Sequence, residues 1–248
     1  MLKLKNARQV EGIARSCALL SELYAALKPR VLPGTSTGEL DEFARDYIVR
    51  AGGKPAFLGY MDYPATLCVS VNEEVIHGIP GKRRLVDGDL VGIDCGIELD
   101  GYFSDAAFSV GVGKVPAEVQ RLMDVTKECL ELAIAQVKPG NRVHHIGKAV
   151  HERAVSAGFG VVRQYCGHGV GFSQHEDPQV PNYVSPGPNP RLVPGMVLAI
   201  EPMINLGTGD VSVLDDDWTV VTLDGKPSAH FEHTVVVTQD GCRVLTSW

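Results

Sequence analysis

Apolar residues recur at steps of three and four residues in four segments, the spacing that predicts amphipathic helices. The segments extend over residues 6–27, 37–51, 116–137 and 144–157. Ser36-Thr-Gly-Glu39 has the form of a capping box before the second segment: Ser36 accepts from an unpaired backbone N–H, and Glu39 reaches back. The pattern predicts two pairs of helices.

The chain between the two helix pairs has the alternation of a β-strand. In residues 91–99 apolar side chains occupy every second position, and Asp100-Gly101 is a strong turn signal because glycine accepts a positive φ. A second strand follows in residues 102–110. We therefore expect a β-hairpin with Asp94 on one strand and Asp105 on the other.

These two aspartates are the first candidate metal ligands. Carboxylates brought side by side by a hairpin repel each other unless a cation or a shared proton lies between them. Facing carboxylates are typical ligands of divalent metals. From the hairpin alone, the alternative that Asp94 or Asp105 points to solvent on an edge strand stays open.

An internal repeat relates the two helix pairs. Pro33-Gly34 and Pro139-Gly140 precede the second helix of each pair, Gly52 and Gly158 follow it, and each position is shifted by 106 residues. A repeat of this length indicates a duplicated helix–helix–strands unit. Chance similarity of two amphipathic helices is the alternative. A pseudo-twofold axis between true repeats would bring strands of both halves together at the centre.

The second half supplies further candidate ligands. Two apolar strands near the end of the sequence each carry one carboxylate, which we expect in mid-strand: Glu201 and Glu232. His168 stands between two glycines, where a ligand can approach closely. Four acids in strands, two from each half, are hard to bury without cations, and they favour His168 as an additional ligand.

Composition indicates an ordinary globular protein. Of 248 residues, 44% are hydrophobic and 21% charged, which allows a sizeable core. The net charge of −7 argues against nucleic acid as the main partner, no apolar run is long enough to predict a membrane span, and the N-terminus lacks a signal-peptide pattern. The six cysteines are scattered without a Cys-x-x-Cys pair, which is typical of reduced thiols in a cytoplasmic protein.

Taken together, the acids and histidines resemble a type I methionine aminopeptidase, a two-metal metallopeptidase of the pita-bread family. The shared contexts, in the family's order, are I-D-x-G-x-x-x-D-G-x-x-x-D, G-H-G-x-G, E-P and F-E-H-T. His77 in H-G-I-P and His175 in H-E-x-P match the family's two active-site histidines that are not metal ligands. The match covers nearly the whole chain.

This resemblance implies an α+β pita-bread fold. Residues 1–248 would form a single catalytic domain, with pseudo-twofold helix–helix–strands halves, roughly 1–112 and 113–248, around a central, mostly antiparallel sheet. It implies a cytoplasmic monomer that hydrolyses the N-terminal methionine from peptides and nascent chains and associates transiently with the ribosome.

The resemblance also implies the metal ligands. Two divalent ions, of Co, Mn, Fe or Zn, would be bound. Asp105 and Glu232 would bridge them, Asp94 would complete one site, and His168 with Glu201 would complete the other.

The remaining roles follow from the same resemblance. A water or hydroxide shared by the metals would attack the peptide carbonyl, with Glu201 as general base, His175 stabilising the oxyanion and His77 contacting the substrate near the scissile amide. The substrate would be bound by His77, His175, Phe57, Tyr60, Tyr63, Cys68, Gln174 and Trp218. Gln174 stands where the family commonly has Phe, and Phe57 where many bacterial members have Cys, which puts strict selection of methionine in question. For Trp218, ordinary core packing is the alternative.

Two other readings compete with this one. Proline-specific relatives, aminopeptidase P and prolidase, usually carry a large extra N-terminal domain, whereas here the first helix begins almost at once. A non-catalytic binding protein of the same fold would have lost metal ligands, and this chain has all five.

Overall fold

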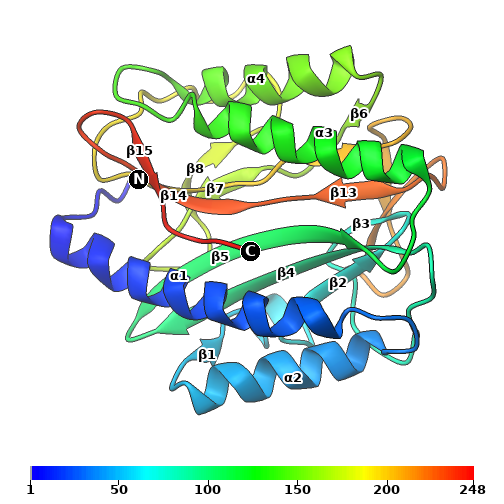
Figure 1. The fold of residues 1–248 in the computed structure, drawn as a ribbon. Helices are drawn as coiled ribbons and strands as arrows, with labels where there is room; N and C mark the ends of the chain where they lie inside the picture. The colour runs from blue at the N-terminus through cyan, green and yellow to red at the C-terminus, as the bar shows by residue number, and fades with distance from the viewer. Residues whose placement is uncertain (1) are drawn as a thin grey trace.

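Four α-helices lie on one side of a set of antiparallel strands in the computed structural model, which describes residues 2–248 (Figure 1). In the first half, α1 (Ala7–Leu27) and α2 (Thr37–Arg50) cover the strands; in the second half, α3 (Ala117–Ile134) and α4 (Val143–Ser156) do so. Short 3-10 turns, η1 (Lys28–Arg30) and η2 (Tyr60–Asp62), complete the helical elements of these residues.

The helices confirm their prediction from the sequence. The capping box at Ser36 and Glu39 is present, with both reciprocal hydrogen bonds. α2 and α4 have 14 residues each. Their first residues and their last residues are offset by 106 positions, as the internal repeat predicts.

The first half of the sheet is built on the predicted hairpin. It consists of β1 (Lys54–Pro55), β2 (Cys68–Val71), β4 (Leu90–Leu99) and β5 (Tyr102–Gly111), in the order β1-β4-β2 with β5 on β4. β4 and β5 pair in unbroken register over ten residues each. Asp100 and Gly101 both have positive φ, 53° and 78°, as a two-residue hairpin turn requires. The hairpin is confirmed.

The second half contains shorter strands. A five-stranded sheet, in the order β15-β14-β9-β7-β8, is formed by β7 (Gly167–Gly169), β8 (Glu176–Val180), β9 (Val197–Ile200), β14 (His233–Val237) and β15 (Cys242–Val244). A three-stranded sheet is formed by β6 (Gly160–Val161), β10 (Met203–Asn205) and β13 (Ser228–His230). Another joins the halves, because β3 (Glu74–Ile76) of the first half pairs with β12 (Val220–Thr222), which also pairs with β11 (Val211–Val213).

Glu201 and Glu232 are not in mid-strand, and that expectation was wrong. Glu201 follows the last residue of β9, and Glu232 lies between β13 and β14. Pro202 has no N–H to extend the ladder beyond Glu201. At Glu232 the chain pairs with the other half instead, because its N–H donates to the Ala107 carbonyl of β5 at 2.8 Å. Both carboxylates therefore stand where the chain passes from one sheet to another.

A common hydrophobic core joins the helices to the strands of both halves. Leu23 of α1, Phe108 of β5, Leu122 of α3 and Val235 of β14 belong to one buried cluster. Tyr24 meets Phe108 edge to face at 4.8 Å, and its hydroxyl donates to the Ala106 carbonyl. Burying a side chain such as Phe108 stabilises the fold by about 1.5–3 kcal/mol. The hairpin that carries the two aspartates is thus packed onto a rigid layer.

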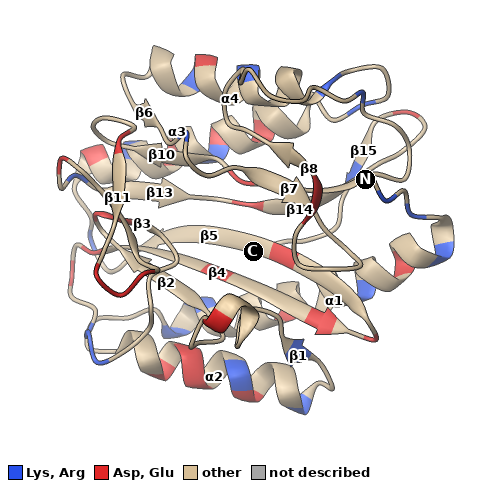
Figure 2. Ribbon diagram, turned by 180° about the vertical axis from the view of Figure 1, so that it is seen from behind, with Lys and Arg blue, Asp and Glu red and all other residues tan. Residues whose placement is uncertain are grey.

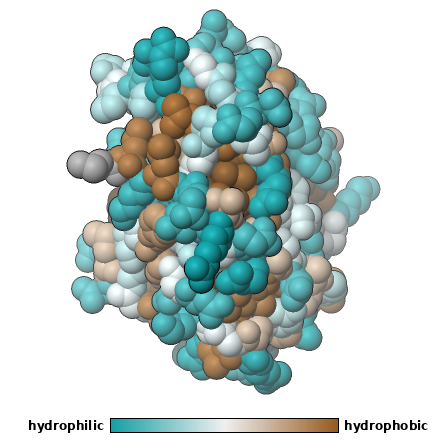
Figure 3. Space-filling model, turned by 90° about the vertical axis from the view of Figure 1, so that its left-hand side faces the viewer, coloured by the Kyte–Doolittle hydropathy of each residue, from teal (hydrophilic) through white to brown (hydrophobic). Residues whose placement is uncertain are grey.

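The outer surface is mixed in character. On the side seen in Figure 3, hydrophobic atoms gather in patches that hydrophilic side chains separate. Leu2, Leu4 and Val184 are among the exposed hydrophobic residues. Of the helices in residues 2–248, none has the length and apolar character that crossing a membrane requires.

Candidate metal centre

The five predicted metal ligands meet in one pocket of about 540 Å³. Asp94 comes from β4, Asp105 from β5 and His168 from β7, whereas Glu201 and Glu232 come from the two strand breaks. Figure 2 shows acidic segments on both β4 and β5. Residues far apart in the sequence are therefore brought together by both halves.

The ligand atoms lie close enough for shared coordination. His168 Nε2 is 3.5 Å from Asp105 Oδ2 and 3.4 Å from Glu201 Oε1. One ligand atom each of Asp105, His168 and Glu232 lies within 4.8 Å of the others. Such spacing suits a cation between the side chains.

Burial shifts the pKa values of the candidate ligands. It raises the pKa of Asp94 to about 7. Burial and then repulsion by neighbouring carboxylates raise the pKa values of Asp105, Glu201 and Glu232 well above the usual range. Burial, with a smaller effect of His175, lowers the pKa of His168 to about 3, which leaves this imidazole neutral and able to bind a metal.

Unpaired oxygen atoms test whether a metal fits. Asp94 Oδ1, Asp105 Oδ1 and Glu232 Oε1 are buried and have no hydrogen-bond partner in the part of the chain that the structure describes. Orphaned carboxylate oxygens are costly unless a cation or a proton satisfies them. A set of four carboxylates and one imidazole suits Mn, Fe, Co or Zn. The residues fit divalent metals.

Glycines give His168 its place. β7 is squeezed between β8 and β9: a Cβ at Gly167 would lie 2.4 Å from the Ala199 carbonyl oxygen, and one at Gly169 would lie 2.3 Å from the Asp177 carbonyl oxygen. Only glycine on each side lets the strand carry the imidazole so close to its neighbours.

The two other predicted histidines form part of the pocket wall. The rings of His175 and His168 have centroids 4.2 Å apart, and His175 Nδ1 lies 2.9 Å from the Tyr60 hydroxyl. His77, with φ of 59°, packs edge to face on Tyr165 and Trp218. Burial, then the nearby His175, lowers the pKa of His77 to about 4, and burial lowers the pKa of His175. Both imidazoles are therefore hydrogen-bonding groups rather than cations at neutral pH.

An aromatic wall faces the acids. Tyr63 meets Trp218 edge to face at 4.9 Å, and the Tyr63 hydroxyl lies 2.9 Å from the Leu67 carbonyl oxygen. The predicted pocket residues found in the lining are Phe57, Tyr60, Tyr63, Cys68, His77, His175 and Trp218. Sequence reasoning missed Met61, Tyr165, Val213 and Asp217, which also line it. Met61 and Asp217 adjoin the predicted Tyr60 and Trp218, and Tyr165 stands two residues before the G-H-G-x-G motif, whereas nothing in the sequence marks Val213.

Gln174 lies elsewhere than expected. It is not among the residues that line the pocket; it is 2% exposed, and its Nε2 donates to Asp105 Oδ2 at 2.5 Å. His230, which sequence reasoning also missed, is buried with Nε2 3.8 Å from Glu201 Oε2. The sequence does offer one indication of His230, since it stands two residues before the predicted ligand Glu232.

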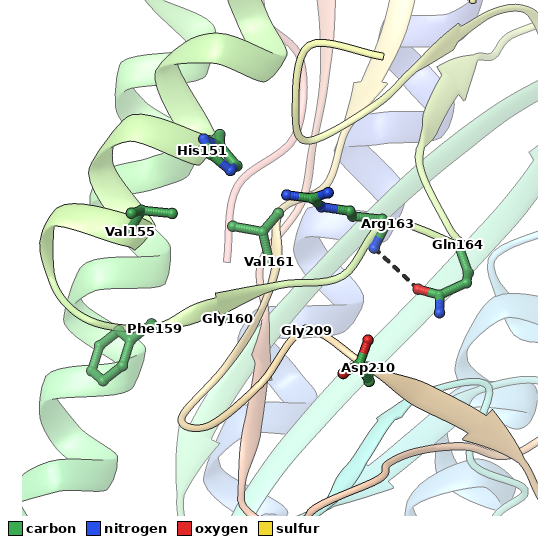
Figure 4. Close-up of a pocket in the computed structure, with 9 residues that line it drawn as sticks. All are labelled: His151, Val155, Phe159, Gly160, Val161, Arg163, Gln164, Gly209 and Asp210. Carbon is green, nitrogen blue, oxygen red and sulfur yellow. Dashed lines mark hydrogen bonds between the residues drawn. The ribbon is translucent and has the colours of Figure 1, made fainter. Parts of the chain in front are cut away.

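A second pocket, of about 320 Å³, lies at α4, β6 and the residues that precede β11 (Figure 4). His151, Arg163 and Asp210 are its titratable side chains, and none of them is buried. The hydrogen bond drawn there runs from the Arg163 backbone N–H to Gln164 Oε1, at 3.2 Å. This pocket has no convergent set of metal ligands among its described residues.

Known proteins share both the sequence and the fold. The model of metallopeptidase family M24 matches residues 11–239. The chain is 49% identical over 247 residues to the methionine aminopeptidase of Borreliella burgdorferi, covering 99% of this chain and 98% of that protein. It is 47% identical over 247 residues to methionine aminopeptidase 1 of Bacillus subtilis, covering 99% of each.

Solved structures of related proteins have the same fold as this chain. The structure of methionine aminopeptidase from Thermotoga maritima has a TM-score of 0.97 and 39% identity over 100% of both chains. Prolidase from Pyrococcus furiosus has the same fold at a TM-score of 0.82 and 23% identity, covering 99% of this chain and 65% of that one. The expected α+β pita-bread fold is thus confirmed. The chain belongs to metallopeptidase family M24 and, within it, to the methionine aminopeptidases.

Proposed function

We propose that this protein removes the N-terminal methionine from peptides and nascent chains by metal-dependent hydrolysis, as a monomer in the cytoplasm that meets its substrates near the ribosome. One observation carries the proposal. Four carboxylates, of which Asp105 and Glu232 are buried, converge with one imidazole in a pocket that also has an aromatic wall. Relatives that are named methionine aminopeptidases and are similar over their whole length support it.

Five side chains would hold two divalent cations. Asp105 and Glu232 would bridge them, Asp94 would complete one site, and His168 with Glu201 would complete the other. The orphaned oxygens of Asp94, Asp105 and Glu232 support cation binding at these residues, because each has capacity left for a cation. When bound, the cations supply Lewis acidity, lowering the pKa of water and polarising a carbonyl.

Glu201 would act as general base. Its carboxylate lies in the ligand cluster, with Oε1 3.4 Å from His168 Nε2, where it would be within reach of water held by the cations. It would take a proton from the attacking water and return it to the leaving amine. The neutral His77 would hydrogen-bond the substrate near the scissile amide.

His175 would stabilise the oxyanion. Its Nδ1 faces the Tyr60 hydroxyl at 2.9 Å, which leaves the other ring nitrogen for a substrate oxygen. The side-chain pocket would be formed by Phe57, Tyr60, Tyr63, Cys68 and Trp218. Aromatic and sulfur contacts of this kind suit the flexible thioether of methionine.

Hydrolysis of three peptides tests the proposal. Met-Ala-Ser, Leu-Ala-Ser and Ala-Pro-Ala are each incubated with metal-free protein and after addition of Mn(II), Co(II) or Fe(II). Release of methionine that requires added metal is the expected result. Equal release of leucine would contradict the pocket, cleavage of Ala-Pro-Ala alone would move the protein to a proline-specific activity, and no cleavage with two metals bound would contradict catalysis itself.

A further inference from the structure

Gln174 is a buried amide that donates to a carboxylate of the acid cluster. Its Nε2 lies 2.5 Å from Asp105 Oδ2, and the residue is 2% exposed. His168 Nε2 approaches the same carboxylate oxygen at 3.5 Å. Asp105 Oδ1, in contrast, has no partner among residues 2–248. One oxygen of Asp105 is therefore held by a neutral donor, and the other is left for a cation.

A tightly held segment presents this amide. Glu176 Oε1 accepts from the backbone N–H groups of Phe172 and Ser173, at 2.7 and 3.1 Å. Glu176 Oε2 is paired with Lys5 Nζ at 2.6 Å, and both side chains are 1% exposed. The loop that carries Gln174 is thus fixed on both sides of this residue, at residues 172–173 by two hydrogen bonds and at Glu176 by a buried ion pair.

A glycine in the hairpin leaves the space for the amide. Gly96 is paired with Asp105 across the β4–β5 ladder. A Cβ at Gly96 would lie 2.7 Å from Gln174 Oε1, 2.8 Å from a ring carbon of Phe57 and 2.9 Å from Gln174 Nε2. Gln174 therefore shares the space over the Gly96 backbone with Phe57, which lines the pocket, and donates to Asp105 from there.

The chemistry of an amide suits a supporting role. A carboxamide N–H keeps its proton at any physiological pH, so it remains a donor to Asp105. Such a donor fixes the rotation of the carboxylate and so directs its other oxygen. Donors in contact with a metal ligand typically account for about 10- to 100-fold in metal affinity or activity.

We propose that Gln174 is a positioning residue, which holds Asp105 in the orientation that binds divalent cations and sets the affinity of that site, rather than a residue that selects the methionine side chain. The inference rests on the proposed role of Asp105 as a metal ligand. It also gives a reason for an amide at a position where the resembling family commonly has Phe.

Two substitutions separate the hydrogen bond from its surroundings. Gln174→Met keeps the length and removes the donor. Gln174→Asn keeps the amide but shortens it by one methylene, so the bond at 2.5 Å is lost while the polarity stays. Gln120→Met is the matched control, because Gln120 Nε2 donates to Asp124 Oδ1 at 2.9 Å on the exposed face of α3, a bond of the same kind away from the pocket.

The measurements are the affinity for Mn(II) alone by titration calorimetry, and kcat and KM for Met-Ala-Ser and Leu-Ala-Ser at saturating Mn(II). We expect both Gln174 variants to bind Mn(II) about 10- to 100-fold more weakly, with the Met-to-Leu ratio of kcat/KM unchanged. Gln120→Met should match the wild type in all of these values.

Other outcomes overturn the inference. Wild-type Mn(II) affinity in either folded Gln174 variant would show that the bond does not position Asp105. A change of the Met-to-Leu ratio at wild-type affinity would return Gln174 to the substrate pocket. Failure of the proposed function would look different, because the wild-type protein itself would then bind no Mn(II) or cleave neither peptide.

Discussion

The two halves of the molecule present their acids to the same pocket in different ways. Asp94 and Asp105 stand on two ten-residue strands in continuous register, so the backbone ladder fixes both of them. Glu201 and Glu232 stand at breaks, where individual hydrogen bonds from other segments replace the ladder. The Glu201 carbonyl accepts from Asn182 Nδ2 at 3.0 Å.

Glu232 depends on partners from both halves of the chain. Its N–H donates to the Ala107 carbonyl of β5 at 2.8 Å, and its carbonyl accepts from Trp248 Nε1 at 3.0 Å. The Trp248 ring also stacks on His233 at 4.6 Å.

The second helices of the two halves are therefore equal in length and lie at matching positions, but the halves carry their acids differently. A continuous ladder carries Asp94 and Asp105, to which Thr234 adds backbone hydrogen bonds at Asp105, whereas Glu201 and Glu232 depend on tertiary contacts alone. Substitutions in the hairpin should therefore lower stability and leave the site of the folded protein intact, whereas substitutions near Glu201 and Glu232 should change the site more directly.

The largest expected effect is at Glu201, in the second half. Glu201→Gln preserves the shape but cannot take a proton from water. We expect kcat for Met-Ala-Ser at saturating Mn(II) to fall about 10²–10⁴-fold, the typical contribution of a general base. Asp210→Asn, an exposed acid at the second pocket, is the control and should retain full activity. A Glu201→Gln variant that turns over normally would remove Glu201 from the chemistry.

The hairpin turn tests the first half. Gly101 has φ of 78°, and a Cβ there would meet no atom within 4 Å, so Gly101→Ala changes only the backbone preference. We expect a loss of about 1–2 kcal/mol in the free energy of unfolding, the cost of a left-handed conformation for an L-residue, with Mn(II) affinity of the folded protein unchanged.

The control for this substitution is Gly241→Ala, which also enters open space but without a positive φ. Denaturant unfolding of the metal-free proteins should show a much smaller loss for it. If Gly101→Ala weakened Mn(II) binding without loss of stability, the hairpin would not be the rigid half.

Trp248 tests the second half. Trp248→Phe keeps an aromatic ring on His233 but removes the donor to the Glu232 carbonyl. We expect the free energy of unfolding to fall by about 0.5–1.5 kcal/mol, typical of one hydrogen bond. We also expect weaker Mn(II) binding, because the backbone of a proposed bridging ligand is released. Calorimetric titration with Mn(II) measures it, with Tyr183→Phe as the control for a ring outside the site. Lower stability at unchanged Mn(II) affinity would reduce Trp248 to a packing residue.

The sequence predicted the elements whose signals are local. Helical spacing, the Ser36 capping box and the Asp100-Gly101 turn each depend on a few neighbouring residues, and all of them are present in the structure. The strand breaks at Glu201 and Glu232 were missed, because an apolar run does not show which sheet each part of it joins. The contact of Gln174 with Asp105 was missed for a similar reason, since residues so far apart meet only through the fold.

The smallest expected effect compares the two repeated helices themselves. Asp46 and Arg50 of α2 form an i,i+4 ion pair at 3.1 Å, and Lys148 and Glu152 of α4 form one at 3.7 Å. All four side chains are largely exposed, so each pair is worth no more than about 0.5 kcal/mol. The acid precedes the base in α2 and follows it in α4, and the first order agrees with the helix dipole.

Asp46→Asn should therefore destabilise the protein slightly more than Glu152→Gln, and 1 M salt should remove the difference because the pairs are screened. Parallel urea titrations of both variants, with and without salt, measure it. Equal losses that persist in salt would mean that these charges act through local helix preference rather than through their ion pairs. The repeat would then be alike in energy as well as in shape, and the contrast between the halves would be confined to the way each holds its acids.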